Sequence, residues 1–282
     1  MRLMGRDSIA ILPAAPIRHR NGDVEYPYRQ DSDFYYLTGF PEPDAVAALI
    51  PGREQAEYVL FVRERDPQRE TWDGRRAGPE GATRDYGADD AFPITDIDEI
   101  LPGLLENRTR VFYAMGVHAD FDKRVIAWVN ALRAQARHGR HPPHEFVALD
   151  YVLHDMRLYK SRAELDLMRQ SARIAAQAHV RAMRACRPGL SEYHIAAELL
   201  HEFQRNNAEP SYPPIVGGGN NSCILHYRDN DQPLRDGDLL LIDAGCEYQY
   251  YASDITRTFP VNGRFTPEQR AVYEIVLEAN RA

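Results

Sequence analysis

Residues 239–259 constrain the fold more than any other stretch, because they place two aspartates in a strand, turn and strand pattern. In an antiparallel pair of strands, the residue numbers of directly opposite residues add up to a constant. If Asp243 lies opposite Asp254, Tyr248 and Gln249 therefore form a two-residue turn. Since side chains alternate along a strand, both carboxylates would then lie on one face of the sheet. The stretch therefore predicts a hairpin with two facing carboxylates.

The strand that leads to Asp243, residues 239–242, is Leu-Leu-Leu-Ile and is apolar on both faces. Such a run is typical of a strand buried in a sheet, where an unpaired carboxylate is costly unless something neutralises it. One or two metal ions would do so. Two alternatives stay open: Gly245 can host a bulge that shifts the register by one, and both aspartates can be ordinary residues of a strand end and a solvated strand.

Length and charge restrict the class of protein. The chain has 282 residues, 44% of them hydrophobic and 27% charged, which predicts two soluble globular domains. Its net charge is -8 and basic residues are interspersed with acids, which argues against a nucleic-acid partner. The longest uncharged apolar runs, such as residues 45–50, are far too short to span a membrane, so no membrane partner is expected.

The cysteines and the first residues bear on the compartment. Cys186, Cys223 and Cys246 match no metal-binding spacing, and an odd number of thiols fits a reducing compartment better than a disulfide framework. The first residues are not followed by an apolar run of signal-peptide length. We therefore expect a cytoplasmic protein.

The first half of the chain alternates strands with helices. Residues 8–12, 45–50, 57–62 and 110–114 are predicted strands, and residues 96–105 and 121–136 are predicted helices. Pro51 and Gly52 separate the second and third strands as a hairpin loop would. This order favours a mixed sheet with helices on its faces, and residues 1–150 are predicted to form one α/β domain.

The second half, residues 151–282, opens with two capped helices. Ser161 and Glu164 have the spacing of a capping box, and the helix after them ends at the Arg-Pro-Gly of residues 187–189. Its predicted buried face consists of Leu165, Met168, Ala172, Ala175, His179 and Met183. A second helix is predicted to begin at Ser191, to end near Asn206, and to bury Ile195, Leu199 and Phe203.

Three catalytic motifs are excluded. His201 and Glu202 lack the second histidine of a zinc-protease helix, because Arg205 stands four residues after His201. The glycines of residues 217–219 lack the Lys-Ser/Thr of a phosphate-binding loop and are interpreted as a turn that allows close backbone approach. No Gly-x-Ser-x-Gly sequence occurs, so serine chemistry has no support.

Several segments together resemble the aminopeptidase P (Xaa-Pro aminopeptidase) family. In the second half these are residues 225–227 (Leu-His-Tyr), 235–239 (Arg-Asp-Gly-Asp-Leu), 242–248 (Ile-Asp-Ala-Gly-Cys-Glu-Tyr) and 254–260 (Asp-Ile-Thr-Arg-Thr-Phe-Pro). In the first half they are residues 25–30 (Glu-Tyr-Pro-Tyr-Arg-Gln), 32–34 (Ser-Asp-Phe), 37–40 (Leu-Thr-Gly-Phe) and 42–43 (Glu-Pro). The resemblance extends over nearly the whole chain and includes both aspartates of the predicted hairpin.

The resemblance implies a creatinase-like amino-terminal α/β domain followed by an α+β pita-bread catalytic domain that holds two divalent metal ions. By their places in the motifs, Asp243 would bind one ion and Asp254 would bridge both. The complete set of four carboxylates and one imidazole favours Mn over a thiolate-seeking metal. His226 matches an active-site histidine that contacts substrate and helps with proton transfer. Without the resemblance, its preferred interpretation is a core histidine beside Tyr227.

The implied activity is release of the first residue from peptides that have proline in the second position. Three alternatives remain: an Xaa-Pro dipeptidase (prolidase), creatinase chemistry without metals, which the two aspartates disfavour, and a non-catalytic pita-bread module that binds peptides. The resemblance also implies a homodimer or homotetramer. Trp72 could line the active site of a neighbouring subunit, or it could be a buried anchor.

Relative to the family pattern, the sequence is expected to be trimmed at both ends. The family's histidine ligand and two glutamate ligands belong to a later stretch, beyond the helix predicted at residues 266–282. The family's helix before the first strand is also missing. An isolated chain of these 282 residues would therefore have two of the five expected ligands, and we expect it to bind Mn weakly, to be inactive as a peptidase and to associate or aggregate.

Overall fold

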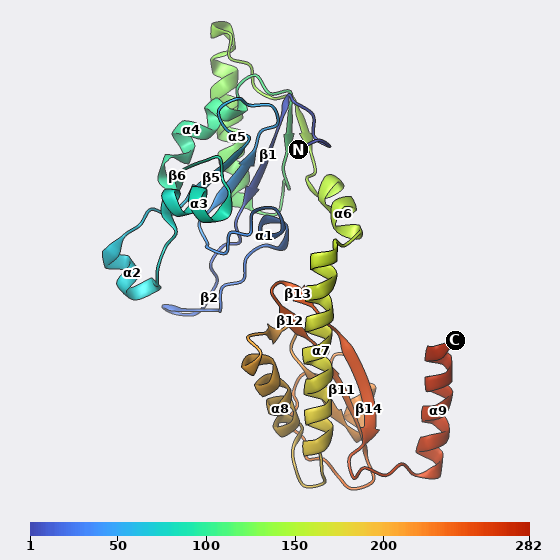
Figure 1. Ribbon diagram of the computed structural model, residues 1–282. Helices are drawn as coiled ribbons and strands as arrows, with labels where there is room; N and C mark the ends of the chain where they lie inside the picture. Colours follow the sequence, from blue (N-terminus) through green and yellow to red (C-terminus); the bar gives the residue numbers. More distant parts are fainter. The chain divides into compact units, whose positions relative to one another are not determined.

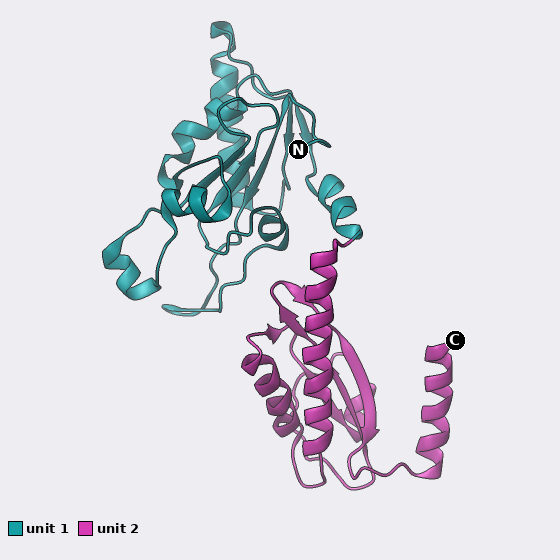
Figure 2. Cartoon of the chain, in the orientation of Figure 1, with its two compact units in different colours: residues 1–159 teal, residues 160–282 magenta.

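The computed structural model describes residues 1–282, which divide into two compact units, Met1–Tyr159 and Lys160–Ala282 (Figure 2). Unit 1 is built on a six-stranded sheet with the order β6-β5-β4-β1-β7-β8. Its strands are β1 (Ser8–Pro13), β4 (Val46–Leu49), β5 (Tyr58–Val62), β6 (Asp90–Pro93), β7 (Arg110–Phe112) and β8 (Glu145–Val147). Strand β4 is antiparallel to β1 and β5, and the other neighbours are parallel, which confirms the predicted mixed sheet.

Helices cover both faces of this sheet because its strands are apolar on both sides (Figure 1). Helices α4 (Ile97–Leu105) and α5 (Ala119–Ala134) pack on the face that carries Ile9 and Ile11. Helices α1 (Ser32–Thr38), α3 (Gly78–Tyr86) and α6 (Asp150–Leu158) contribute to the core on the face that carries Ala10 and Leu12.

Several short elements of unit 1 escaped the sequence analysis. They are helices α1, α3, α6 and α2 (Pro67–Asp73), strands β6 and β8, and the hairpin of β2 (His19–Asn21) and β3 (Val24–Glu25). Each is too short to show a clear period, and caps such as Asp31 on α1 define it instead. Helix α6 lies in unit 1 because Leu149 and Leu153 are buried in its core, whereas the predicted domain of residues 1–150 ends at the first residue of this helix.

Unit 2 combines two three-stranded antiparallel sheets, ordered β10-β11-β14 and β13-β12-β9. The strands are β9 (Glu209–Pro210), β10 (Ile215–Gly218), β11 (Leu239–Ala244), β12 (Cys246–Tyr248), β13 (Tyr251–Ala252) and β14 (Ile255–Pro260). Helices α7 (Arg162–Ala185) and α8 (Glu192–Arg205) pack on one sheet face and share a core with Leu240, Ile242 and Ala244. Helix α9 (Pro267–Arg281) buries none of its residues.

Helix α7 has the predicted capping box of Ser161 and Glu164, but its buried face is rotated relative to the prediction. The buried residues are Ser171, Ile174, Ala175, Ala178, His179 and Ala182. Leu165 and Met183, which were predicted to be buried, are exposed. The helix packs through its small side chains because these allow close approach to α8 and the sheet, while its longer apolar side chains flank the contact. Helix α8 begins after Ser191 and buries Ile195, Leu199 and Phe203, as predicted.

Strand β11 is buried on one face only, which corrects the prediction from its apolar sequence. Leu240, Ile242 and Ala244 are buried, whereas Leu239, Leu241 and Asp243 are half-buried. The second face of β11 therefore carries both apolar side chains and one of the two aspartates. In the whole chain, no helix combines the length and the apolar character that a membrane span requires.

Candidate metal centre

The strands around the two aspartates pair in a register two residues away from the predicted one. Asp243 of β11 lies opposite Thr256 of β14, so the prediction of Asp243 opposite Asp254 is wrong. Beyond Gly245 the same register continues, with Glu247 opposite Ala252, so no extra residue is inserted and the bulge considered at Gly245 is absent. Because the shift is by an even number of residues, Asp243 and Thr256 still share a face.

Gly245 explains this register. A Cβ atom at this position would lie 1.7 Å from the carbonyl oxygen of Ser253, so only glycine allows the two strands to come this close. Ser211 stabilises the contact: its hydroxyl donates to the Ser253 carbonyl at 2.9 Å, and its N–H donates to the Gly245 carbonyl at 3.1 Å. Ser253 and Asp254 consequently lie between β13 and β14, outside both strands.

The turn of the hairpin lies at Gln249 and Tyr250, one residue later than predicted. Both residues have positive φ angles, 47° and 69°, as in a type I′ turn. Neither is the asparagine or glycine that usually takes this conformation, so no local signal fixes the turn. The contact at Gly245 therefore determines the register more than the turn does.

Tyr212 brings the two carboxylates together. Its hydroxyl lies 2.5 Å from Oδ1 of Asp243 and 2.9 Å from Oδ1 of Asp254. The tyrosine lies on the segment between β9 and β10, and β10 pairs with β11 so that Ile215 is opposite Asp243. The sheet thus places Tyr212 beside residues far away in the sequence. This tyrosine is not among the residues predicted from the sequence, because no spacing distinguishes it from the other tyrosines.

The environment of Tyr212 keeps its hydroxyl protonated. Burial, and then its hydrogen bonds to Asp243 and Asp254, raise the pKa of the tyrosine well above its usual value. A hydroxyl has a single proton, so it donates to one of the two carboxylates at a time. Asp243 is half-buried and Asp254 is exposed. Their convergence concentrates negative charge at a place where a cation would relieve the repulsion.

No third metal-binding side chain of this chain completes the pair. The one group of three such residues with ligand atoms close together is Asp33, Asp150 and His154 in unit 1. That group is half-buried or exposed, and Asp33 already forms an ion pair with Arg157. Neither observation points to a metal there, since exposed acidic groups occur commonly without one. Asp243 and Asp254 therefore remain a pair of carboxylates and are the candidate ligands of a metal site.

His226 lies on an exposed turn that follows the short helix η3 (Gly219–Cys223). Its neighbour Tyr227 is buried, so the interpretation of His226 as a core histidine is wrong, and the tyrosine is the core residue instead. No hydrogen bond joins His226 to Asp243 or Asp254. The structure thus brings the two aspartates together and leaves the histidine on a surface turn of the same unit.

Trp72 is 89% exposed at the end of α2, so the interpretation as a buried anchor is wrong. It lines a hollow of about 800 Å³ in unit 1 together with Arg63, Arg69 and Arg76. The alternative, contact with a neighbouring subunit, stays a prediction.

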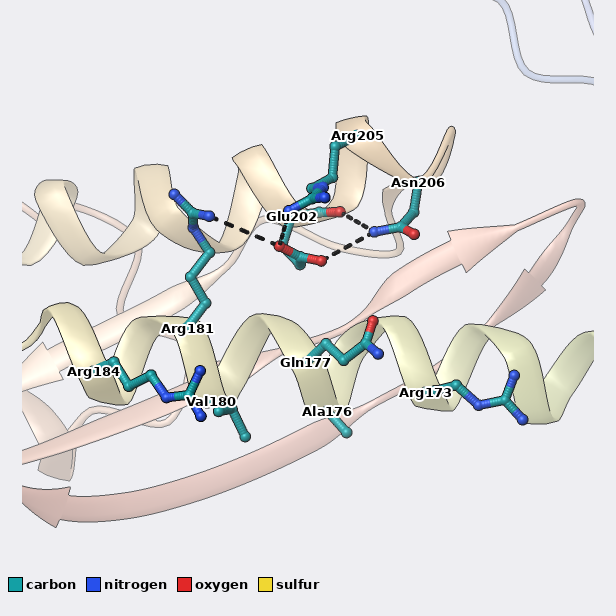
Figure 3. Close-up of a pocket in the computed structure, with 9 residues that line it drawn as sticks. All are labelled: Arg173, Ala176, Gln177, Val180, Arg181, Arg184, Glu202, Arg205 and Asn206. Atoms are coloured by element: carbon teal, nitrogen blue, oxygen red, sulfur yellow. Dashed lines mark hydrogen bonds and ion pairs between the residues drawn. The ribbon is translucent and has the colours of Figure 1, made fainter.

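A second hollow, of about 810 Å³, lies along helices α7 and α8 and is lined by arginines (Figure 3). Glu202 lies among them, 3.7 Å from Arg205 and 4.0 Å from Arg181, and Asn206 donates to it at 3.1 Å. Arg181 also pairs with Glu198 at 2.5 Å. Glu202 is the one carboxylate among four lining arginines, and no group of three metal-binding side chains lies here, so the metal centre is the better candidate for chemistry.

Comparisons with known proteins give matches to both halves of the chain. Residues 166–282 match the model of "Metallopeptidase family M24", and residues 1–113 match that of "Aminopeptidase P, N-terminal domain". The Xaa-Pro aminopeptidase of Escherichia coli K12 is 48% identical over 274 residues, which cover 96% of this chain and 62% of the relative. Human Xaa-Pro aminopeptidase 3 is 34% identical over 98% of this chain and 55% of the relative.

Solved structures give the same result. The structure of Pseudomonas aeruginosa aminopeptidase PepP superposes with a TM-score of 0.98 at 65% identity, over 100% of this chain and 64% of that protein. A substrate complex of an E. coli aminopeptidase P variant superposes with a TM-score of 0.95 at 48% identity, over 98% and 63% of the two chains. This chain therefore spans less than two thirds of the length of these relatives.

Proposed function

Because this chain belongs to the aminopeptidase P family, we propose that it is part of a metal-dependent aminopeptidase that acts on peptides with proline in the second position. The enzyme would release the residue that precedes this proline. The observation that carries the proposal is the convergence of Asp243 and Asp254 on one hydroxyl, within the region that matches the M24 metallopeptidases. Residues 1–150 would form the amino-terminal domain and residues 151–282 the first half of the catalytic domain.

The side chains at the candidate centre fit a hard divalent ion. The donors are carboxylate oxygens, and no cysteine or histidine forms a group of three ligand atoms with them, a set that suits Mn or Mg better than a metal that prefers sulfur. We propose two ions, Mn by preference, with Asp243 on one and Asp254 on both. When bound, such ions supply Lewis acidity that polarises the scissile carbonyl and makes water a nucleophile near neutral pH.

Residues of this chain would orient the groups around that chemistry. Tyr212 holds both carboxylates at hydrogen-bond distance, so it fixes the direction in which their free oxygen atoms point. We assign to His226 a contact with the substrate and a part in proton transfer. Proline contributes a nitrogen without a hydrogen to the scissile bond, and this nitrogen must gain a proton as it leaves.

Assembly and location follow as further parts of the proposal. All three cysteines are free thiols, which supports a reducing compartment such as the cytoplasm. A tryptophan side chain that is exposed to water in a monomer gains free energy when a subunit contact buries it. The exposure of Trp72 therefore supports association into a homodimer or homotetramer. The partners of the enzyme would be peptides and further copies of itself.

Peptide hydrolysis by the full-length protein tests the activity. We would measure release of the first residue from a tripeptide with proline second, after removal of metal and after addition of Mn. The matched control peptide has alanine in place of proline. Mn-dependent cleavage confined to the proline peptide supports the proposal, whereas equal cleavage of both peptides would contradict it.

The length of the substrate separates the two nearest alternatives. A dipeptidase of the prolidase type cuts Xaa-Pro but not the same sequence extended by one or more residues. An aminopeptidase cuts the extended peptides. Binding of these peptides without any turnover, in protein that retains its metal, would instead indicate a non-catalytic module.

A further inference from the structure

Glu192 is a fully buried carboxylate that no part of the proposed chemistry uses. It is the first residue of α8, and its exposed fraction is 0%. Its Oε1 atom accepts from the N–H of Gly218 at 2.7 Å and from Nδ2 of Asn221 at 3.0 Å. Its Oε2 atom accepts from the hydroxyl of Tyr227 at 2.7 Å and from the N–H of Gln232 at 3.0 Å. Four donors therefore offset the cost of burying the charge.

All four donors belong to the segment of residues 218–232, which leads from the end of β10 to the isolated bridge between Pro233 and Ser191. The segment folds tightly, because a Cβ atom on Gly217 would lie 2.9 Å from the backbone of Asn221. Asn221 also donates to the Tyr227 hydroxyl at 3.1 Å, which closes a ring of hydrogen bonds with Glu192. At the far end, the N–H of Glu192 donates to the carbonyl of Gln232 at 3.0 Å. One side chain thus holds both ends and the middle of the segment.

His226 lies within this segment, directly before Tyr227. The Tyr227 side chain is 6% exposed, and burial, followed by its hydrogen bond to Glu192, raises the pKa of its hydroxyl to about 12. His226 itself is exposed and has no such anchor. The segment begins at β10, whose Ile215 lies opposite Asp243 of β11. The position of His226 relative to Asp243 is therefore set by β10 at one end and by the Tyr227 anchor at the other.

We propose that Glu192 is a positioning residue that holds His226 in place relative to the carboxylates of Asp243 and Asp254. This inference rests on the proposed function, because it takes His226 as a participant in catalysis. The charge of Glu192 is required, since only an ionised carboxylate can accept from four donors at once. In Glu192→Gln, an amide NH₂ would face two of these donors and leave them unsatisfied. The segment would then lose its fixed conformation, although Asp243 and Asp254 would stay on their strands.

The test uses the full-length protein loaded with Mn and four variants: Glu192→Gln, Tyr227→Phe, His226→Ala and the double variant Glu192→Gln/His226→Ala. Glu198→Gln is the matched control, because it also neutralises a glutamate of α8 but removes only the ion pair with Arg181. We expect kcat to fall roughly 10–100-fold in Glu192→Gln, by analogy with the range typical of residues that orient metal ligands. KM and metal content should change little, and Tyr227→Phe, which removes one of four donors, should have a smaller effect in the same direction.

The double variant decides whether Glu192 acts through His226. If it does, adding Glu192→Gln to His226→Ala costs no further activity, because the group to be positioned is already gone. A full additional loss of activity, or a loss of bound metal, would assign Glu192 a general structural role and overturn the proposal. Should Glu192→Gln fail to fold, the comparison of Tyr227→Phe alone and with His226→Ala decides the same question.

Amide hydrogen exchange tests the effect of Glu192 on the segment independently of peptidase activity. We expect faster exchange of residues 219–232 in Glu192→Gln and Tyr227→Phe than in the parent and the Glu198→Gln control. Unchanged exchange in this segment would overturn the proposal even in an active enzyme. The proposed function fails if His226→Ala is fully active or if no Xaa-Pro peptide is cut. The role of Glu192 in catalysis then fails too. Faster exchange in Glu192→Gln would in that case show only that Glu192 orders the segment.

Discussion

At the scale of single residues, the candidate metal centre consists of two carboxylates and one hydroxyl. Asp243 is half-buried on a strand, whereas Asp254 is exposed between two strands. Tyr212 is within hydrogen-bond distance of both. Because the three side chains differ in position, we expect their substitution to affect metal binding and activity to different degrees.

Asp243→Ala and Asp254→Ala in the full-length protein should both abolish Mn-dependent cleavage, and Asp254→Ala should be the worse of the two. A ligand that bridges two ions serves both of them, so its loss affects the whole centre. Metal content and hydrolysis of an Xaa-Pro peptide are the measurements. The loss of activity should exceed the roughly 10–100-fold effect that is typical of residues that orient metal ligands without binding the metal. Near-normal hydrolysis by Asp254→Ala would refute the assignment of the site.

Tyr212→Phe should lower activity or metal affinity roughly 10–100-fold without unfolding the protein. The phenyl ring keeps the packing of the tyrosine, but the two carboxylates lose the donor that holds them in position. Metal titration and the temperature of unfolding, measured on parent and variant, separate the two effects. An unchanged Mn affinity together with unchanged turnover would show that the hydroxyl does not orient the ligands.

How far the sequence specifies the site depends on the kind of interaction. Asp243 and Asp254 stand out because a carboxylate beside an apolar strand demands a partner, and their motifs support the same interpretation. Tyr212 does not stand out, because its role arises from the pairing of β10 with β11 and not from any local pattern. Glu192 is hidden for a similar reason: nothing in the sequence distinguishes a buried glutamate with four donors from an ordinary first-turn glutamate of a helix.

At the scale of elements, Gly245 has the strongest effect on the strand pair. The hairpin was predicted from the two aspartates, yet its register is set by the contact between Gly245 and Ser253. A glycine whose missing side chain permits close approach cannot be told from a glycine of a bulge by sequence alone. The starts of helices α7 and α8 are easier to predict, because the capping box at Ser161 and the period of α8 are local signals.

Gly245→Ala should destabilise unit 2 by at least the upper end of the ~1–3 kcal/mol typical of overpacking, because the new methyl group would overlap the Ser253 carbonyl. The strands would have to separate, and the position of Asp254 would change with them. Gly103→Ala is the matched control, since Gly103 lies in helix α4 with no atom within 4 Å of the added Cβ. Thermal unfolding and Mn content of the full-length variants test this, and equal stability of the two variants would show that the contact is not restrictive.

At the scale of the whole molecule, the number of ligands limits what these 282 residues can do. They supply two carboxylates at the candidate centre and no third ligand beside them. The second face of β11 also carries half-buried leucines. A polypeptide of residues 1–282 should therefore bind Mn weakly, cleave no Xaa-Pro peptide, and associate in solution. Sedimentation and the tripeptide assay are the measurements, and turnover like that of the full-length protein would contradict this expectation.

Unit 1, in contrast, contains two apolar cores of its own, one on each face of its sheet. A polypeptide of residues 1–159 should accordingly fold alone and unfold in one cooperative transition. A polypeptide of residues 1–150 would lose helix α6 and with it Leu153, which is fully buried. Removing a buried leucine typically costs about 2–5 kcal/mol, so the shorter polypeptide should unfold at a clearly lower urea concentration. If both polypeptides unfold at the same concentration, α6 does not belong to the cooperative unit, and the boundary near residue 150 is the better division of the chain.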